Sequence, residues 1–133
     1  MLMLMLMLAG CIADPQHGQT VELLDGLSTA RVILSQQPAR LDEACNAVGD
    51  VQTRLYGEPG LANVQPAWSQ LRDAAAALHA VCGQATLLDQ PSPDSAAIRA
   101  AHQRWQSGIQ REMGVACDHL RATAAALNRE APC

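Results

Sequence analysis

The chain has 133 residues, which is the length of a single domain that can bury a hydrophobic core unaided. All nine of its positive side chains are Arg, and the formal net charge is −4, so the overall charge does not favour nucleic acid or anionic lipid. With no Phe, one Tyr and two Trp, the chain also lacks the aromatic platforms on which nucleobases stack. We therefore expect no nucleic-acid partner.

The N-terminal residues alternate Met and Leu and then read Leu8-Ala9-Gly10-Cys11. An apolar residue, two small residues and a cysteine in this order resemble the lipobox of bacterial lipoproteins. In that class a diacylglycerol is joined to the cysteine thiol and a peptidase cuts before it, so the resemblance implies a signal peptide over residues 1–10 and a covalent lipid on Cys11. The apolar run before the small residues is too short to span a bilayer, which takes about 20 residues in a helix, so the implied anchor is the lipid.

The lipobox resemblance also implies a location. In diderm bacteria an Asp after the lipidated cysteine favours retention in the inner membrane, whereas this chain has Ile12. The resemblance therefore implies the periplasmic face of the outer membrane. The segment from Met1 to Leu8 departs from the pattern because it has no Arg or Lys, and a misplaced start codon or a shortened sequence would explain this.

Residues 11–19 are predicted to form a short tether, because they contain Asp14-Pro15 and Gly18 and show no apolar periodicity. A helical domain is predicted over residues 20–133. From Thr20, apolar residues recur every seven positions, which is typical of a helix with one buried face. They are Leu27, Leu34, Leu41, Val48 and Leu55.

Pro38 interrupts this stripe, and it could mark a kink or a turn. Leu34 and Leu41 keep their spacing across the proline, whereas a connecting loop would usually shift the phase. We therefore predict one kinked helix of about 36 residues, some 54 Å long. The alternative is a four-helix bundle with a turn at Pro38.

Two further helices are predicted after the turn signal Gly57-Glu58-Pro59-Gly60. The second follows Pro66 and runs to about Pro91, and the third starts at the capping pair Ser92-Pro93. Its apolar stripe comprises Ile98, His102, Trp105, Ile109, Met113, Cys117, Leu120, Ala124 and Leu127. The predicted fold class is all-α, an antiparallel up-down-up bundle of three long helices.

Four cysteines remain after Cys11, an even set that suits two disulfides in an oxidising envelope. The turn at residues 57–65 places Cys45 near the height of Cys82, and kink or tilt could close the remaining gap. The last five residues could fold back to bring Cys133 to Cys117. We predict Cys45–Cys82 and Cys117–Cys133.

One cluster has metal-ligating side chains. If the second and third helices meet at Pro91, His79 and His102 share a height, and Cys82 lies one turn from His79. Thiolate and imidazole are the donors that zinc and copper prefer. A weaker alternative is therefore a small metal- or cofactor-binding helical lipoprotein that uses His79, Cys82 and His102.

The sequence contains no catalytic motif that we recognise. Cys117 and His119 are two residues apart, hence on different faces of a helix, which does not support an activated thiol. The sequence predicts a non-enzymatic envelope lipoprotein without a cofactor, held to the membrane through its lipid. Its helix faces suit docking of another envelope protein.

Overall fold

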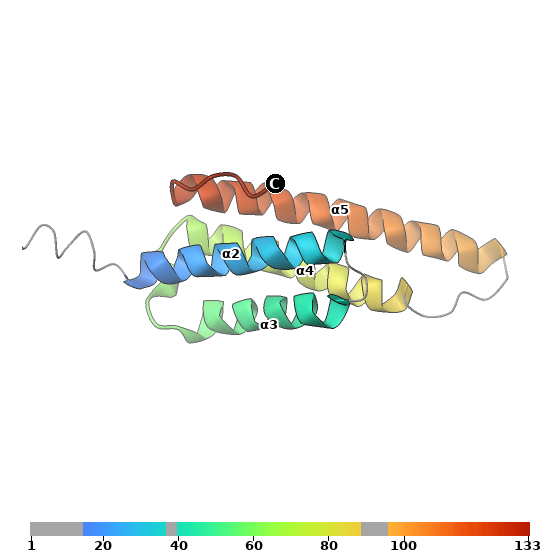
Figure 1. The fold of residues 1–133 in the computed structure, drawn as a ribbon, viewed down its shortest axis with the longest axis horizontal. Helices are drawn as coiled ribbons and strands as arrows, with labels where there is room; N and C mark the ends of the chain where they lie inside the picture. Colours follow the sequence, from blue (N-terminus) through green and yellow to red (C-terminus); the bar gives the residue numbers. More distant parts are fainter. Residues whose placement is uncertain (1–14, 37–39, 89–95) are drawn as a thin grey trace, which may run out of the picture.

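The computed structural model describes residues 15–36, 40–88 and 96–133 (Figure 1). Within these residues the chain is all-helical, with four α-helices and no strand. The helices are α2 (Pro15–Gln36), α3 (Leu41–Gly57), α4 (Ala67–Leu88) and α5 (Ala96–Ala126). A short 3-10 helix, η2 (Leu61–Asn63), lies between α3 and α4.

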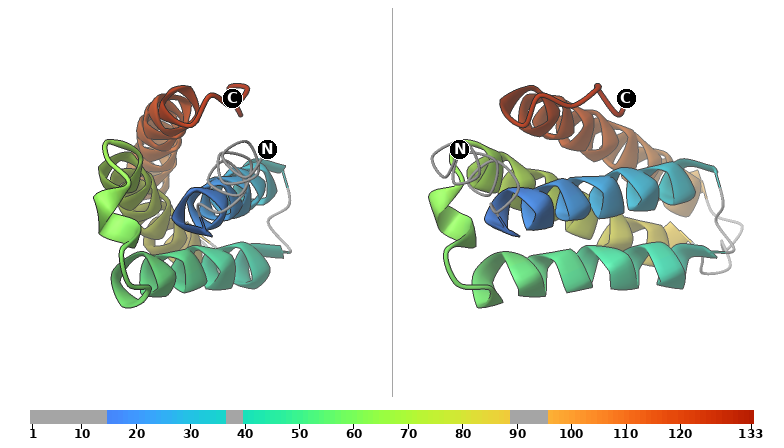
Figure 2. Two further views of the ribbon diagram at one scale, coloured as in Figure 1. Left: turned by 90° about the vertical axis from the view of Figure 1, so that its left-hand side faces the viewer. Right: turned by 60° about the vertical axis from the view of Figure 1, so that its left-hand side comes forward.

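The prediction of three helices is wrong, because the described residues form four α-helices. Helix α2 ends at Gln36, and α3 begins at Leu41 and returns alongside it (Figures 1 and 2). Pro38 itself lies outside the described residues. Folding back lets the apolar faces of the two short helices pack together, whereas a single kinked helix of about 54 Å would carry half of its stripe past its partners.

Helix α2 starts earlier than expected. It begins at Pro15, so residues 15–19, predicted as tether, are helical. Proline is favoured in the first helical turn, where its missing N–H is not needed. The side chain of Thr20 is buried, and its hydroxyl donates a hydrogen bond to the Gln16 carbonyl at 2.6 Å. These residues therefore belong to the folded body.

The core lies around α4, which packs against each of the other three α-helices. The largest fully buried side chains are Leu23, Leu27, Leu55, Leu61, Leu71, Leu78, Leu120, Val48, Val81, Thr20 and Thr123. Leu41 was expected in this core, but it is only partly buried, because it is the first residue of α3 and no preceding turn covers it. Leu34 is also partly buried and packs at the edge of the core.

The predicted turn after α3 is present. Gly60 adopts a left-handed conformation with φ 79°, which glycine enters without steric cost. A Cβ at this position would lie 2.6 Å from Gln16 Nε2, so glycine also allows the start of α2 to lie against the turn. The turn and the beginning of α2 therefore share one end of the bundle (Figure 2).

Helix α5 ends in a left-handed residue, Asn128, with φ 55°. The Arg129 N–H donates to the Ala124 carbonyl at 2.8 Å, and the Asn128 N–H donates to the Ala125 carbonyl at 3.3 Å. This is the bonding of a Schellman C-cap, which satisfies the last carbonyls and reverses the chain. The tail consequently runs back along α5 (Figure 1).

Candidate interaction surface

Helix α5 has two halves with different surroundings. Residues 113–126 include six buried side chains, whereas no described side chain in residues 96–112 is buried. Residues 96–112 belong to the part of the α4–α5 hairpin that extends past the ends of α2 and α3 (Figure 1). The first half of α5 is thus packed on α4 but uncovered by the other two helices. We call residues 96–112 the projecting half of α5.

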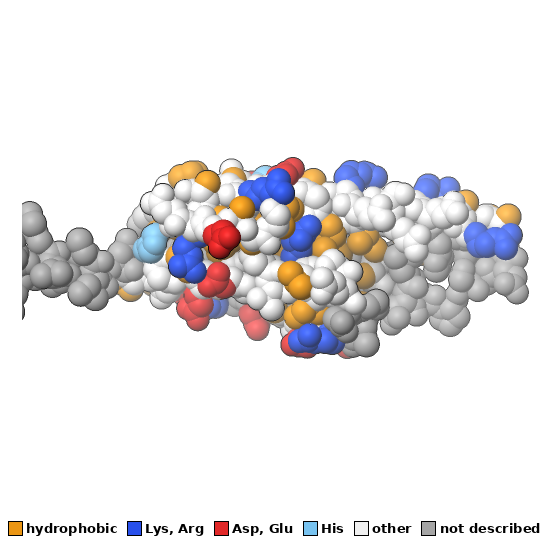
Figure 3. All heavy atoms as spheres, turned by 45° about the horizontal axis from the view of Figure 1, so that its top comes forward, with side chains coloured by type: hydrophobic (Ala, Val, Ile, Leu, Met, Phe, Trp, Pro, Cys, Tyr) orange, Lys and Arg blue, Asp and Glu red, His pale blue; other side chains and the backbone are white. Residues whose placement is uncertain are grey.

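The projecting half is locally basic although the whole chain is acidic. Residues 96–111 contain Arg99, Arg104 and Arg111 and no Asp or Glu. No carboxylate in the described part of the chain lies within ion-pair distance of these three side chains. Figure 3 shows Arg side chains spaced along α5, while the acidic side chains in this view gather mainly away from the projecting half. Among the described residues, these three arginines are therefore not paired with a carboxylate, although Glu112 follows Arg111 at the end of the segment.

Arg104 and Arg111 are seven residues apart and so lie on one face of the helix. Together with Ala100, Gln103 and Ser107 they line a shallow depression of about 410 Å³. Arginine presents several N–H donors in a planar fork that matches the geometry of a carboxylate. This face can accept acidic side chains without displacing an existing salt bridge.

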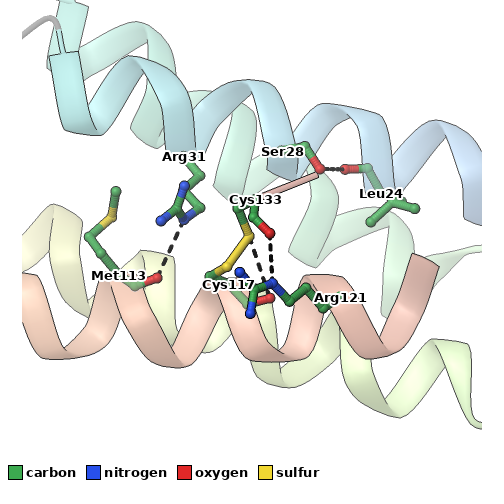
Figure 4. The surroundings of a disulfide bond; sticks show 7 residues. All are labelled: Leu24, Ser28, Arg31, Met113, Cys117, Arg121 and Cys133. Atoms are coloured by element: carbon green, nitrogen blue, oxygen red, sulfur yellow. Dashed lines mark hydrogen bonds between the residues drawn. A yellow bond between two sulfur atoms is a disulfide. The ribbon is translucent and has the colours of Figure 1, made fainter. Parts of the chain in front are cut away.

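An apolar groove adjoins the projecting half where α5 meets α2. Its lining residues are Arg31, Leu34, Ser35, Ile109, Gln110, Met113 and Gly114, around a volume of about 410 Å³. Arg31 crosses the groove and its Nε donates to the Met113 carbonyl at 3.4 Å (Figure 4). The combination of partly exposed Leu34 and Ile109 with nearby Arg is typical of protein contact surfaces.

The two predicted cysteine pairs lie at disulfide distance. Cys45 and Cys82 join α3 to α4 with a Cα separation of 5.8 Å. Cys117 and Cys133 join α5 to the returning tail with a Cα separation of 6.0 Å (Figure 4). Arg121 holds the same tail, because its Nε donates to the Cys133 carbonyl at 2.6 Å.

The tail and α2 border another depression on the described surface. It has a volume of about 670 Å³ and is lined by Leu24, Asp25, Ser28, Thr29 and residues 128–132. The hydroxyl of Ser28 is already bonded to the Leu24 carbonyl at 2.7 Å. Asp25 and Arg129 are more than half exposed and lie 4.0 Å apart. We find no buried polar group aimed into this space and assign it no ligand.

Of the weaker metal-site alternative, the structure describes the side chains of His79 and Cys82 only. Cys82 is joined to Cys45, and His79 is exposed. The side chain of His102 is outside the described set, and among described residues no group of three His, Cys, Asp or Glu side chains could hold a metal. The bond that Cys82 makes leaves no thiolate for a metal ion.

The assumed register between α4 and α5 was also wrong. His119 Nδ1 lies 2.7 Å from Gln70 Oε1, and a Cβ on Gly108 would lie 2.9 Å from Gln84 Oε1. Both contacts place the centre of the hairpin about four residues beyond Pro91. His79 and His102 are therefore about 13 Å apart along the helix axis.

No family model matches the chain. No curated protein and no solved structure matches it either. None of the described helices combines the length and apolarity needed to cross a membrane.

The basic surface was not predicted from the sequence, because the net charge of −4 describes the whole chain and not this segment. The available signal was local: sixteen consecutive residues, 96–111, contain three Arg and no acid. The lipobox residues, Leu8 to Cys11, lie outside the described residues.

Proposed function

We propose that this chain is a non-enzymatic, lipid-anchored protein of the bacterial cell envelope that docks an acidic surface of another envelope protein. The observation that carries the docking role is the projecting half of α5, where Arg104 and Arg111 lie on one face without a carboxylate partner among the described residues. The adjoining groove with Leu34 and Ile109 supplies apolar area beside the charges. Charged contacts of this kind set partner choice and association rate.

The anchor is proposed from Leu8-Ala9-Gly10-Cys11 and from the start of α2 only four residues after Cys11. The compartment is proposed from the two cysteine pairs at disulfide distance, because disulfides persist in the periplasm and at cell surfaces. With Ile12 after the lipidated cysteine, the outer membrane is the proposed site in a diderm host. The ligand of the protein is another protein, and no cofactor beyond the covalent lipid is proposed.

Docking is tested by placing a photo-crosslinking residue at Ser107, between Arg104 and Arg111, in the host cell. We expect a crosslinked product that disappears in the double variant Arg104→Glu and Arg111→Glu. The matched control is Arg129→Glu, an exposed arginine just beyond the C-terminal end of α5, which should keep the product. A product that survives the double reversal, or is lost equally in the control, contradicts docking through this face.

Lipidation is tested separately by labelled palmitate. The chain with an intact signal should incorporate the label in its host, and Cys11→Ser should not. Equal incorporation in both would refute the anchor while leaving the docking experiment unaffected.

A further inference from the structure

One end of the bundle carries an aromatic cluster. Trp68, in the first turn of α4, donates its Nε1–H to the Leu55 carbonyl at 2.8 Å. The ring of Tyr56 meets the Trp68 ring edge to face, with centroids 5.6 Å apart. The Arg72 guanidinium carbon lies 5.4 Å from the Trp68 ring centroid. The chain has one Tyr and two Trp, so most of its aromatic side chains gather here.

The Tyr56–Trp68–Arg72 cluster remains open to solvent. Tyr56 is 68% exposed, Trp68 is partly buried, and the Arg72 side chain is 43% exposed. Two carboxylates near the cluster are paired with arginines: Glu58 with Arg54 at 2.7 Å, and Asp73 with Arg72 at 3.1 Å. An exposed tyrosine beside a tryptophan has an apolar body and polar tips, which favours the boundary between headgroups and acyl chains.

The cluster lies at the end of the bundle where α2 begins. Gly60, in the turn between Tyr56 and Trp68, is against Gln16 in the first turn of α2 (Figure 2). Cys11 precedes Pro15 by four residues. Four residues span at most about 14 Å even when fully extended. A lipid on Cys11 would therefore hold this end of the bundle against the surface of the bilayer.

We infer that Tyr56, Trp68 and Arg72 form a membrane-interface contact with the phospholipid headgroups of the bilayer that holds the Cys11 lipid. This inference rests on the proposed lipid anchor. The rings insert at the headgroup level, and the Arg72 guanidinium, whose Nε is bonded to Asp73, donates to a lipid phosphate through its terminal nitrogens. The contact turns the projecting half of α5, at the opposite end, away from the bilayer and toward a partner (Figure 1).

The second tryptophan provides an internal control. Given the register of α4 and α5, Trp105 lies beside the last turns of α4, about 27 Å along the axis from Trp68. Trp105→Phe therefore leaves a fluorophore only at the cluster, and Trp68→Phe leaves one only at the far end. Far-UV circular dichroism establishes that both variants are folded.

The experiment uses the full lipidated chain, purified from host membranes and reconstituted into phosphatidylcholine–phosphatidylglycerol vesicles. Two vesicle samples are compared. One contains lipid that is brominated close to the headgroup and quenches tryptophan fluorescence only on contact, and the other contains no brominated lipid. Flotation of the vesicles first establishes anchoring. We expect brominated lipid to quench Trp68 in the Trp105→Phe protein and to leave Trp105 in the Trp68→Phe protein unchanged.

Each outcome either supports or contradicts the inferred membrane contact. Protein that floats without quenching of Trp68, or with equal quenching of both tryptophans, overturns the inference and leaves the anchor standing. Protein that fails to float overturns both. In the Trp105→Phe background, Tyr56→Ser should lessen the quenching of Trp68. Val32→Ser, which removes an exposed apolar side chain from α2, should not.

Discussion

The cross-link between α3 and α4 should contribute a large share of the stability of this bundle. Cys45 and Cys82 are separated by 37 residues in sequence, and their bond holds the two helices at a Cα separation of 5.8 Å. Closing a loop of this length lowers the entropy of the unfolded chain, and the chain-entropy relation gives about 4 kcal/mol. We therefore expect Cys45→Ala with Cys82→Ala to lower the free energy of unfolding by about 4 kcal/mol.

The assay is urea unfolding followed by far-UV circular dichroism, on the oxidised protein in which Cys11→Ser removes the lipid. The double variant should also show a steeper dependence on urea, because an uncross-linked unfolded chain exposes more surface. Cys45→Ala alone serves as the control and should lose about as much stability, since either change opens the loop. A loss below about 1 kcal/mol with an unchanged urea slope would refute a Cys45–Cys82 bond in the folded protein.

Three further outcomes follow from local geometry. Leu78→Ala removes a fully buried side chain and should cost about 2 to 5 kcal/mol in urea unfolding, whereas Leu41→Ala at a partly exposed helix start should cost less than about 1.5 kcal/mol. Equal costs would contradict the separate helices α2 and α3. Asn128→Ala should cost about 1 kcal/mol because alanine is strained at φ 55°, while Asn128→Gly should be close to neutral, again by urea unfolding. Paired hydrogen bonds from the Arg40 guanidinium at 2.8 Å lower the pKa of the Glu43 carboxyl. These hydrogen bonds stabilise the folded protein at pH values above the ordinary carboxyl pKa, and this stabilisation is lost as the pH falls through the lowered pKa of Glu43. Arg40→Ala should therefore raise the Glu43 pKa in an NMR titration, and an unchanged pKa would contradict the pair.

The two ends of the molecule differ in chemistry, and this difference connects the two proposals. One end has Tyr56, Trp68 and the start of α2, while the other has the basic projecting half of α5. Helix α5 has 31 residues and is therefore about 46 Å long. A bundle standing on its aromatic end would present Arg104 and Arg111 well beyond the headgroup layer.

Sequence periodicity was sufficient to predict an all-helical protein and the turn after α3, because both depend on local interactions. Apolar spacing specifies a helix face, and Gly57-Glu58-Pro59-Gly60 offers the chain no regular continuation. The Cys45 and Cys82 pair could be placed for the same reason, since a short turn determines which residues of α3 and α4 lie at equal height.

Only the tertiary structure decided the direction of the chain at Pro38 and the register of α5 on α4. Leu34 and Leu41 are seven residues apart whether the chain continues or reverses, so their spacing carries no information about direction. The register depends on how the chain connects α4 to α5, and the predicted helix start at Ser92-Pro93 lies outside the described residues.

The candidate surface also depended on tertiary structure. The apolar stripe through Trp105 and Ile109 continues into Met113 without a change of period, so the sequence predicted burial along all of α5. A periodic apolar pattern indicates that a helix has an apolar face. It does not indicate whether another helix is long enough to cover that face. Because α2 and α3 stop short of the α4–α5 hairpin, the projecting half of α5 is left to solvent with its arginines unpaired by any described carboxylate (Figure 1).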